Sequence, residues 1–165
     1  MKKFYSVSLF FLTLIFSLQA QEKYYFQSEF SKEEFAKRRS QIFDQIGNNA
    51  IAVIQGASGI PGFSVFRQSN SFYYLTGIET PRAYLLLNGR NKRATLYLPH
   101  RDEGMENNQG KVLSAEDAEL VKKLMGVEQV KGIEFLSADL VGTGLIKPPA
   151  PVLYTEFSPA EIGND

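Results

Sequence analysis

The residue types that could support acid–base or metal chemistry gather in one short stretch, His100-Arg101-Asp102-Glu103, with Glu106 close behind. His100 is the only histidine and the chain has no cysteine, so one copy cannot assemble a histidine cluster, a thiolate zinc site or a thiol nucleophile. The acidic residues lack the spacing of an EF-hand loop. A lone histidine after a strand is more often a polar surface residue than a catalytic one. We therefore assign no catalytic and no metal-ligating residue.

Two other kinds of active site also lack support. A two-metal nuclease needs acidic side chains on its strands, but the strand-like segments 50–54, 84–87 and 94–98 contain no Asp or Glu. A serine hydrolase needs a Gly-x-Ser-x-Gly elbow, which is absent. The glycine-rich loop 56–62 lacks the Gly-Lys-Ser/Thr ending of a phosphate-binding loop. Asp102, Glu103 and Glu106 are predicted to lie in a solvated acidic loop.

The composition is that of an ordinary globular protein. The chain has 165 residues, with 18 basic and 18 acidic side chains, so its net charge gives no electrostatic reason to bind nucleic acid or an anionic membrane. Its length suits one domain with a sizeable core. Without cysteine, that core cannot rely on disulfides. We expect one packed domain with no nucleic-acid partner.

The first twenty residues have the layout of a secretory signal peptide. Lys2 and Lys3 precede an apolar run at residues 4–18, and polar sequence follows Ala20. As a helix this run would rise roughly 22 Å, which is short of the roughly 30 Å bilayer core. We expect cleavage near Ala20, export to the periplasm or the extracellular space, and no permanent membrane anchor.

A helix is predicted directly after an N-terminal arm at residues 21–30. Ser31 and Glu34 form a capping-box pattern, with phenylalanines at the two staple positions. Apolar residues recur at helical spacing as far as Ile46, and Gly47 occupies a helix-stop position. We expect the basic side chains of this segment to form its solvated face: Lys32, Lys37, Arg38 and Arg39.

Strands are predicted from short apolar runs bounded by turn residues. Residues 50–54 are typical of a buried strand, and residues 84–87 and 94–98, joined by a turn with Asn-Gly, predict a loose hairpin. A second helix is predicted at 114–125, where Ser114 and Asp117 repeat the cap pattern. The remaining predicted elements are a short strand at 127–130, a helical turn at 137–140 and a last strand at 152–157. This alternation of helix and strand predicts an α/β fold.

The segment that starts at Phe66, FRQSNSFYYLTGIETP, is unusually rich in aromatic residues. Aromatic side chains at this density are normally core. Polar side chains among them must reach solvent or find partners, because burying a polar group unpaired costs roughly 2–7 kcal/mol. We expect the polar ones to tie the loop to neighbouring backbone and the glycine to end a helical turn. The predicted structural motif consists of Arg67, Gln68, Asn70, Phe72, Tyr74 and Gly77.

Four features in sequence order resemble the N-terminal domain of Xaa-Pro aminopeptidases (aminopeptidase P). They are the 31–46 helix with its Lys-Arg-Arg run, the 50–54 strand, the FRQSNSFYYLTGIETP block, and ATLYLPHRD with the Glu-containing loop that ends at Gly110. The resemblance covers residues 31–140. It implies a creatinase-type domain at 31–157, a mixed β-sheet flanked by helices with ribonuclease-H-like topology, and the start of a linker at 158–165. The family commonly has a tryptophan in the loop after Glu106, and this chain has none.

The resemblance also implies a function that this chain would serve as part of a longer protein. In the family, a C-terminal pita-bread domain holds two divalent metals, usually manganese, and releases the N-terminal residue from peptides with proline in second position. None of its five metal ligands, which in the family are two Asp, one His and two Glu, maps onto this sequence. We therefore expect the chain to bind no cofactor and to be inactive alone, with the missing catalytic domain as its partner.

The resemblance implies that the domain serves assembly and forms a part of the active-site rim. The resemblance implies a homo-oligomer when the enzyme is full length, and contact with the peptide substrate only through that full enzyme. Candidates for rim or inter-subunit contacts are His100, Arg101, Asp102 and Glu106. The alternative is a free-standing, non-enzymatic binding or oligomerisation module derived from the same family. The gene sequence beyond codon 165 distinguishes the two.

Overall fold

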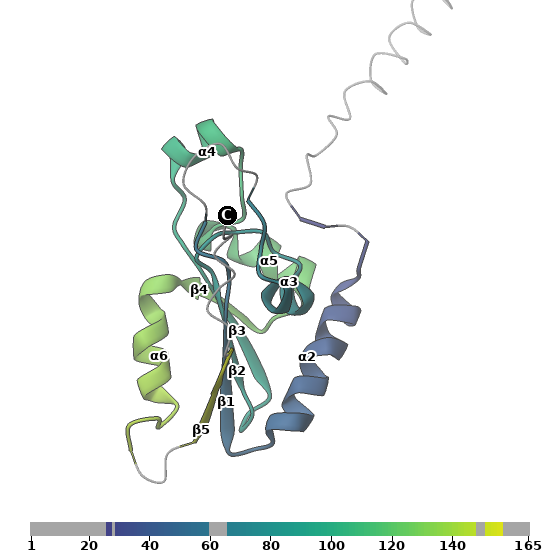
Figure 1. Ribbon diagram of the computed structural model, residues 1–165, viewed down its shortest axis with the longest axis vertical. Helices are drawn as coiled ribbons and strands as arrows, with labels where there is room; N and C mark the ends of the chain where they lie inside the picture. Colours follow the sequence, from purple (N-terminus) through teal and green to yellow (C-terminus); the bar gives the residue numbers. More distant parts are fainter. Residues whose placement is uncertain (1–25, 28, 60–65, 148–150, 157–165) are drawn as a thin grey trace, which may run out of the picture.

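A mixed five-stranded sheet organises the chain, for which a computed structural model describes residues 26–27, 29–59, 66–147 and 151–156 (Figure 1). The strand order is β4-β3-β2-β1-β5. The strands are β1 (Ala50–Gln55), β2 (Tyr84–Asn88), β3 (Arg93–Leu98), β4 (Gln129–Gly132) and β5 (Val152–Thr155). β1, β2 and β3 are antiparallel neighbours, whereas β4 runs parallel to β3 and β5 parallel to β1. The predicted α/β mixed sheet is confirmed.

The predicted hairpin joins β2 and β3. The side chain of Asn88 accepts a hydrogen bond from the backbone N–H of Arg90 at 3.0 Å, and that of Asn91 accepts one from Arg93 at 3.2 Å. Lys92 takes a left-handed backbone conformation with φ 53°. These local hydrogen bonds close a turn that is longer than two residues, so the prediction of a loose hairpin is confirmed. The strand predicted at 127–130 lies slightly later in the chain, as β4.

Different helices cover the two faces of the sheet (Figure 1). On one face, α2 (Lys32–Ile46), α3 (Asn70–Thr76) and α5 (Ala118–Met125) enclose the larger core. On the other face, α6 (Leu136–Gly142) packs through Leu136 and Leu140 on a smaller cluster formed by Ile51, Leu86 and Tyr97. Successive strand residues point to opposite faces, which is why adjacent residues of one strand serve different clusters.

The start and end of α2 follow the predicted local signals. The hydroxyl of Ser31 accepts a hydrogen bond from the backbone N–H of Glu34 at 3.4 Å. The rings of Phe30 and Phe35 meet edge to face with centroids 6.2 Å apart, as a hydrophobic staple requires. Gly47 ends the helix with φ 70°. The helix is confirmed, and its N-terminus is fixed by contacts within a few residues.

The prediction that the basic residues of α2 form a solvated face is wrong for two of them. Arg38 and Arg39 are only 9% and 2% exposed. Arg39 donates hydrogen bonds to the carbonyls of Leu75, Met125 and Gly126 at 3.1, 2.8 and 2.8 Å, at the C-terminal ends of α3 and α5. Helix C-termini carry unsatisfied carbonyls and partial negative charge. A buried guanidinium therefore replaces water at two helix ends.

Arg38 is enclosed by aromatic rings. Its guanidinium carbon lies 4.3 Å from the ring centroid of Phe30 and 4.4 Å from that of Tyr74. It also donates to the carboxylate of Glu34 and to the backbone carbonyl of Tyr74, both at 3.0 Å. The stack therefore joins the start of α2 to α3.

Several elements differ from the sequence prediction. The predicted acidic loop contains a short helix, α4 (Glu103–Gln109), whose first turn is capped by the Asp102 carboxylate accepting from Met105 N–H at 3.0 Å. Its lack of an apolar period explains why the pattern gave no helix. The predicted second helix begins as a 3₁₀ turn, η1 (Ala115–Asp117), before α5, and the turn η2 (Ile133–Phe135) precedes α6.

Some predictions fall on residues that the structure does not describe. The signal peptide, most of the N-terminal arm and the linker at 158–165 lie outside the described ranges. Within those ranges, none of the helices has both the length and the apolar character needed to cross a bilayer.

Candidate functional site

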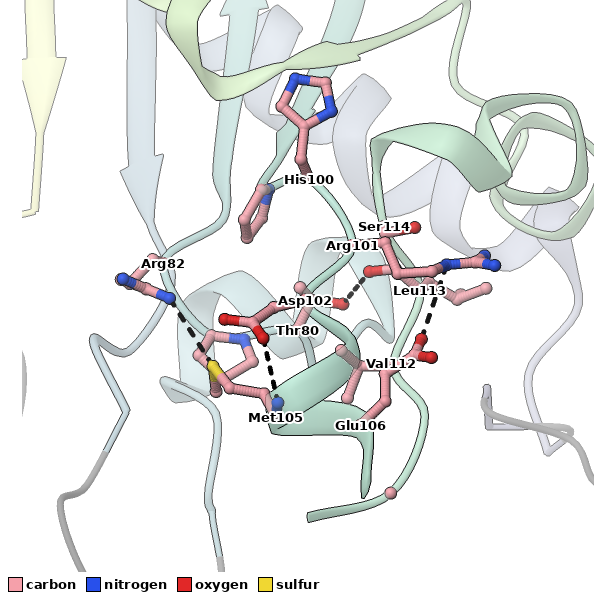
Figure 2. A pocket seen from close by; sticks show the side chains of 13 residues that line it. Thr80, Arg82, His100, Arg101, Asp102, Met105, Glu106, Val112, Leu113 and Ser114 are labelled. Atoms are coloured by element: carbon pink, nitrogen blue, oxygen red, sulfur yellow. Dashed lines mark hydrogen bonds and ion pairs between the residues drawn. The ribbon is translucent and has the colours of Figure 1, made fainter. Parts of the chain in front are cut away.

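A small cavity of about 50 Å³ lies between the turn before β2, the segment after β3 and α4 (Figure 2). Its apolar lining includes Pro81, Pro99, Met105, Val112 and Leu113, and its charged lining is Arg82, His100, Arg101, Asp102 and Glu106. One water needs roughly 10–15 Å³ of such volume, and complete ligand pockets usually measure roughly 300–1,000 Å³. The cavity can therefore take a water molecule or a small group, and it is smaller than a complete ligand pocket.

The turn before β2 fixes one wall of the cavity. The hydroxyl of Thr80 donates a hydrogen bond to the carbonyl of Leu113 at 2.6 Å. Arg82 has a left-handed backbone with φ 57°, and its N–H donates to the carbonyl of Ala57 at 2.8 Å. Its guanidinium reaches the sulfur of Met105 at 3.9 Å across the cavity (Figure 2). Arg82 therefore presents a positive charge beside an apolar surface.

Arg101 holds a second wall through ion pairs. Its guanidinium is 2.8 Å from the carboxylate of Asp117 and 3.6 Å from that of Glu106. Its backbone N–H donates to Glu116 at 2.9 Å. The hydrogen bond to Asp117 and the nearby negative charges raise the pKa of Arg101. These contacts join α4 and η1 to the segment that follows β3.

His100 is clamped between two carboxylates. Its Nδ1 lies 2.6 Å from the carboxylate of Glu116, and its Nε2 lies 3.2 Å from that of Glu134. These hydrogen bonds raise the pKa of the imidazole, and the same bond to His100 is the largest cause that lowers the pKa of Glu116 to about 2. When protonated, the ring donates from both nitrogens. It then has no free nitrogen to act as a base or a metal ligand.

The four predicted rim residues are thus brought near one cavity but face different partners. Figure 2 shows the His100 side chain pointing away from Asp102 and Glu106. His100 turns toward η1 and η2, whereas Arg101 and Glu106 pair with each other and Asp102 caps α4.

The donor set does not fit a two-metal centre. Within the ranges that the structure describes, no three or more His, Asp or Glu side chains are grouped so that they could hold a metal ion. Glu116 and Glu134 bind opposite nitrogens of His100, so the three groups do not converge on one point.

Gln68 ties the aromatic block to its surroundings. It is 6% exposed, and its carbonyl oxygen accepts hydrogen bonds from Ala57 N–H at 2.6 Å and Ser69 N–H at 3.0 Å. Its amide donates to the carbonyl of Thr80 at 3.0 Å. Arg67 and Asn70, in contrast, are exposed and reach solvent. The fixed backbone partners expected for the three polar residues are therefore found at Gln68, the buried one.

The other motif residues are structural in different ways. Phe72 is fully buried in the main core, whereas Tyr74 is 51% exposed and stacks on Arg38. Gly77 ends α3 with φ 66°. A Cβ at this position would lie 2.5 Å from the ring of Phe35, so both the backbone conformation and the close approach require glycine.

Sequence reasoning missed the partners of the rim residues. Glu116 and Glu134 are 16 and 34 residues from His100, and no local pattern connects them. The exception is Asp117, whose capping box with Ser114 was predicted and is confirmed. Arg82 gave no sequence signal, since its role depends on which segments meet around the cavity.

Comparison with known proteins places this fold in a family. Residues 35–144 match the family model of the aminopeptidase P N-terminal domain. The Xaa-Pro aminopeptidase of Haemophilus influenzae is 32% identical over an alignment of 99 residues that covers 56% of this chain and 23% of that protein.

Solved structures agree with the family match. A structure from Bacillus anthracis assigned to aminopeptidase P has a TM-score of 0.65 at 20% identity, over 82% of this chain and 33% of its own. Escherichia coli aminopeptidase P in its low-pH form has a TM-score of 0.58 at 26% identity, over 70% of this chain and 27% of its own. The chain thus spans a third or less of each of these relatives. It belongs to the aminopeptidase P N-terminal domain family.

Proposed function

We propose that this chain is the N-terminal, non-catalytic domain of an exported Xaa-Pro aminopeptidase, where it serves assembly and forms part of the active-site rim. The family match over residues 35–144 supports this proposal. The Haemophilus relative is named as a peptidase, and the matched region is only 23% of it. We assign the hydrolytic chemistry to a further domain of the kind that occupies the remainder of such relatives.

The observation that carries the proposal is the family match on a domain whose described residues hold no group of metal ligands. A two-metal peptidase needs several convergent carboxylates and usually a histidine. Manganese enters the proposal only through the family resemblance and only for the full enzyme, and no residue of this chain is assigned to hold it.

The cavity beside α4 supports the rim role. It combines an apolar lining with the guanidinium of Arg82, and ion pairs of Arg101 fix one wall. Its volume of about 50 Å³ suits a single small group of a bound peptide. A second domain would supply the remainder of such a site.

The first test is the gene sequence beyond codon 165. An in-frame domain with two Asp, one His and two Glu ligands supports the proposal, and the full-length protein should then cleave Xaa-Pro peptides in a chelator-sensitive manner. The chain from residue 21 alone, which keeps every described residue, should show no turnover with added manganese. Turnover that follows this chain through purification and disappears with chelator would contradict the proposal.

The rim role has its own test in the full-length enzyme. Arg82→Ala should raise KM for the peptide with little change in kcat, because Arg82 would contribute to binding and not to bond cleavage. Lys37→Ala, an exposed change on α2, is the matched control. Equal KM values for the two variants would remove Arg82 from the rim.

The second candidate function is a free-standing binding or oligomerisation module. The observation in its favour is that the described residues close their own core, with Phe72, Leu85 and Leu96 fully buried. A stop codon directly after codon 165 would favour this function over the first.

Export is a separate part of the proposal, supported by the charged start and short apolar run of residues 1–20. Mass analysis of secreted or periplasmic material should find Gln21 at the new N-terminus. An intact Met1 species recovered from membranes would contradict cleavage.

A further inference from the structure

Arg82 brings to the cavity beside α4 a positive charge that no ion pair offsets among the residues that the structure describes. The other basic side chains of the lining, His100 and Arg101, are each paired with two carboxylates. The guanidinium of Arg82 instead approaches the sulfur of Met105 at 3.9 Å (Figure 2). Residues 60–65, which lie outside the described ranges, contain no acid in their sequence. The cavity therefore offers a cation to an anionic group of a ligand.

The turn that carries Arg82 is held by hydrogen bonds from three separate segments. The amide of Gln68 donates to the carbonyl of Thr80 at 3.0 Å, and the hydroxyl of Thr80 donates to the carbonyl of Leu113 at 2.6 Å. The N–H of Arg82 donates to the carbonyl of Ala57 at 2.8 Å. Its φ of 57° is uncommon for a residue other than glycine. Such conformations persist where the surrounding structure enforces them, and they cluster at ligand sites.

The size and lining of the cavity suit a carboxylate. One water needs roughly 10–15 Å³ of such volume, so the cavity of about 50 Å³ has room for about three atoms of that size. A carboxylate has three heavy atoms, and a guanidinium binds it through two parallel hydrogen bonds. The apolar side chains of Pro81 and Val112, which also line the cavity, can contact the aliphatic carbon next to the carboxylate.

We propose that Arg82 binds a carboxylate of the peptide substrate in this cavity, and so gives the enzyme a preference for peptides with a negative charge after the proline. The inference rests on the proposed function, because a further domain would hold the N-terminal residue and the proline at its catalytic centre. The rim then meets the residues that follow. The carboxylate is either the chain end of a short peptide or an acidic side chain.

Asp102 restricts where the carboxylate can bind. Its own carboxylate lines the cavity and accepts a hydrogen bond from the N–H of Met105 at 3.0 Å, as the cap of α4. Because like charges repel, the ligand carboxylate binds on the Arg82 side. Asp102→Asn removes the negative charge and keeps an oxygen suited to the cap, so this variant should bind the carboxylate severalfold more tightly.

The first experiment measures binding in the chain from residue 21 and needs no peptidase activity. From residue 21 onward the sequence has two methionines, Met105 in the cavity lining and Met125 fully buried in the core. Their methyl NMR signals therefore provide a probe and an internal control. The dipeptide Pro-Ala should shift the Met105 signal and not the Met125 signal. It should bind about tenfold more tightly than its C-terminal amide at equal ionic strength, because the amide lacks the charge.

Variants of the same chain test whether Arg82 causes this preference. Arg82→Gln should bind the acid and the amide equally. Arg90→Gln, the same change at an exposed position of the β2–β3 turn, is the matched control and should keep the preference. Equal binding of the two dipeptides by the parent chain, or a preference that survives Arg82→Gln, would overturn the proposal. Weaker binding by a folded Asp102→Asn variant would also overturn it.

The second experiment uses the full-length enzyme and distinguishes the two sources of the carboxylate. Ala-Pro-Ala and its amide test the chain end, and the amides of Ala-Pro-Glu and Ala-Pro-Gln test the side chain. At least one pair should differ about tenfold in kcat/KM in the parent enzyme and in Arg90→Gln, but not in Arg82→Gln.

The outcomes of the second experiment separate this inference from the proposed function. Cleavage of all four peptides with equal kcat/KM within both pairs would overturn the carboxylate site and leave the proposed function in place. A full-length protein that cleaves none of them would overturn the proposed function, and with it the assignment of the carboxylate to a substrate.

Discussion

Two basic regions of this chain place similar side chains in opposite surroundings. On α2, Arg39 is 2% exposed and donates to three backbone carbonyls. After β3, Arg101 has a side chain that is 40% exposed and pairs with carboxylates of Glu106 and Asp117. The buried guanidinium completes two helix ends, whereas the exposed one joins surface segments. The same residue type therefore supports the core in one place and the shape of a cavity wall in the other.

The difference follows from solvation. Burial lowers the pKa of Arg39 to about 10, with Glu128 opposing the shift, so the group stays charged at neutral pH and needs all its acceptors. In an exposed ion pair, water and salt ions compete for the charged groups, so the pair contributes little to the free energy of unfolding. Perturbing Arg39 should therefore affect folding far more than perturbing Arg101.

The largest effect is expected for Arg39→Met. Removing the guanidinium leaves three carbonyls without their donor, since Leu75, Met125 and Gly126 all rely on it. We expect a loss of about 3 kcal/mol in the free energy of unfolding and a melting temperature lower by about 10 °C. Lys37→Met, an exposed change on the same helix, should shift stability by less than about 0.5 kcal/mol. Equal melting temperatures for the two variants would contradict the role of Arg39.

The next effect is expected for Gln68→Leu. The substitution replaces the amide by an apolar side chain of similar size and removes the hydrogen bonds to Ala57, Ser69 and Thr80. Unsatisfied buried partners should cost about 1–3 kcal/mol, measured by urea denaturation. Arg67→Met is the control: its side chain is exposed, and it should change stability by less than about 0.5 kcal/mol. A larger loss for Arg67→Met would show that our assignment of the two neighbours is reversed.

A smaller effect that depends on salt is expected for Arg101→Met. The variant loses two ion pairs that water can reach. Its melting temperature should fall slightly in low salt and match the parent chain at about 1 M salt, where the Debye length is about 3 Å. The lower melting temperature of Arg39→Met should persist at high salt, because the partners of the Arg39 side chain are buried carbonyls. If salt had no effect on the loss of melting temperature in either variant, the proposed difference between the two regions would be wrong.

The smallest effect is the pH dependence of the His100 clamp. The pKa of His100 is raised from 6.5, so its stabilising contribution is complete below pH 6.5 and is lost as pH rises through the folded-state value. The pKa of Glu116 falls from 4.5 to about 2, so its contribution is complete above pH 4.5 and is lost as pH falls toward 2. Melting temperatures of the parent chain and His100→Gln should differ most between pH 4.5 and 6.5. A difference that is constant from pH 4 to pH 9 would exclude titration of the clamp.

The sequence predicted much of the fold because its signals are local. The cap of Ser31, the helix stop at Gly47, the capping box at Ser114 and the glycine at 77 involve residues a few positions apart. Apolar runs likewise located the strands, because a strand that is buried on both faces is a short continuous run of apolar residues. α4 was missed because its stability at the N-terminus comes from the polar cap of Asp102 and not from an apolar period.

The candidate site was predicted only as far as it is contiguous. His100, Arg101, Asp102 and Glu106 were selected because they lie together in the chain, and all four line the cavity. Arg82 and Val112, which also line it, could not be identified, because sequence spacing does not say which turns meet. Similarly, Gln68 could not be separated from Arg67 and Asn70 before their burial was known.

By itself, the sequence determined the class of fold, both ends of α2, the C-terminal ends of α3 and α5, and the resemblance that indicates the family, because caps, turns and periodicity are short-range properties of the chain. The tertiary structure decided the partners. Arg39 meets acceptors 36 and 86 residues away, and His100 meets carboxylates 16 and 34 residues away. Whether a charged side chain is buried and bonded or exposed and screened depends on the packing of distant segments, and local patterns do not encode that packing.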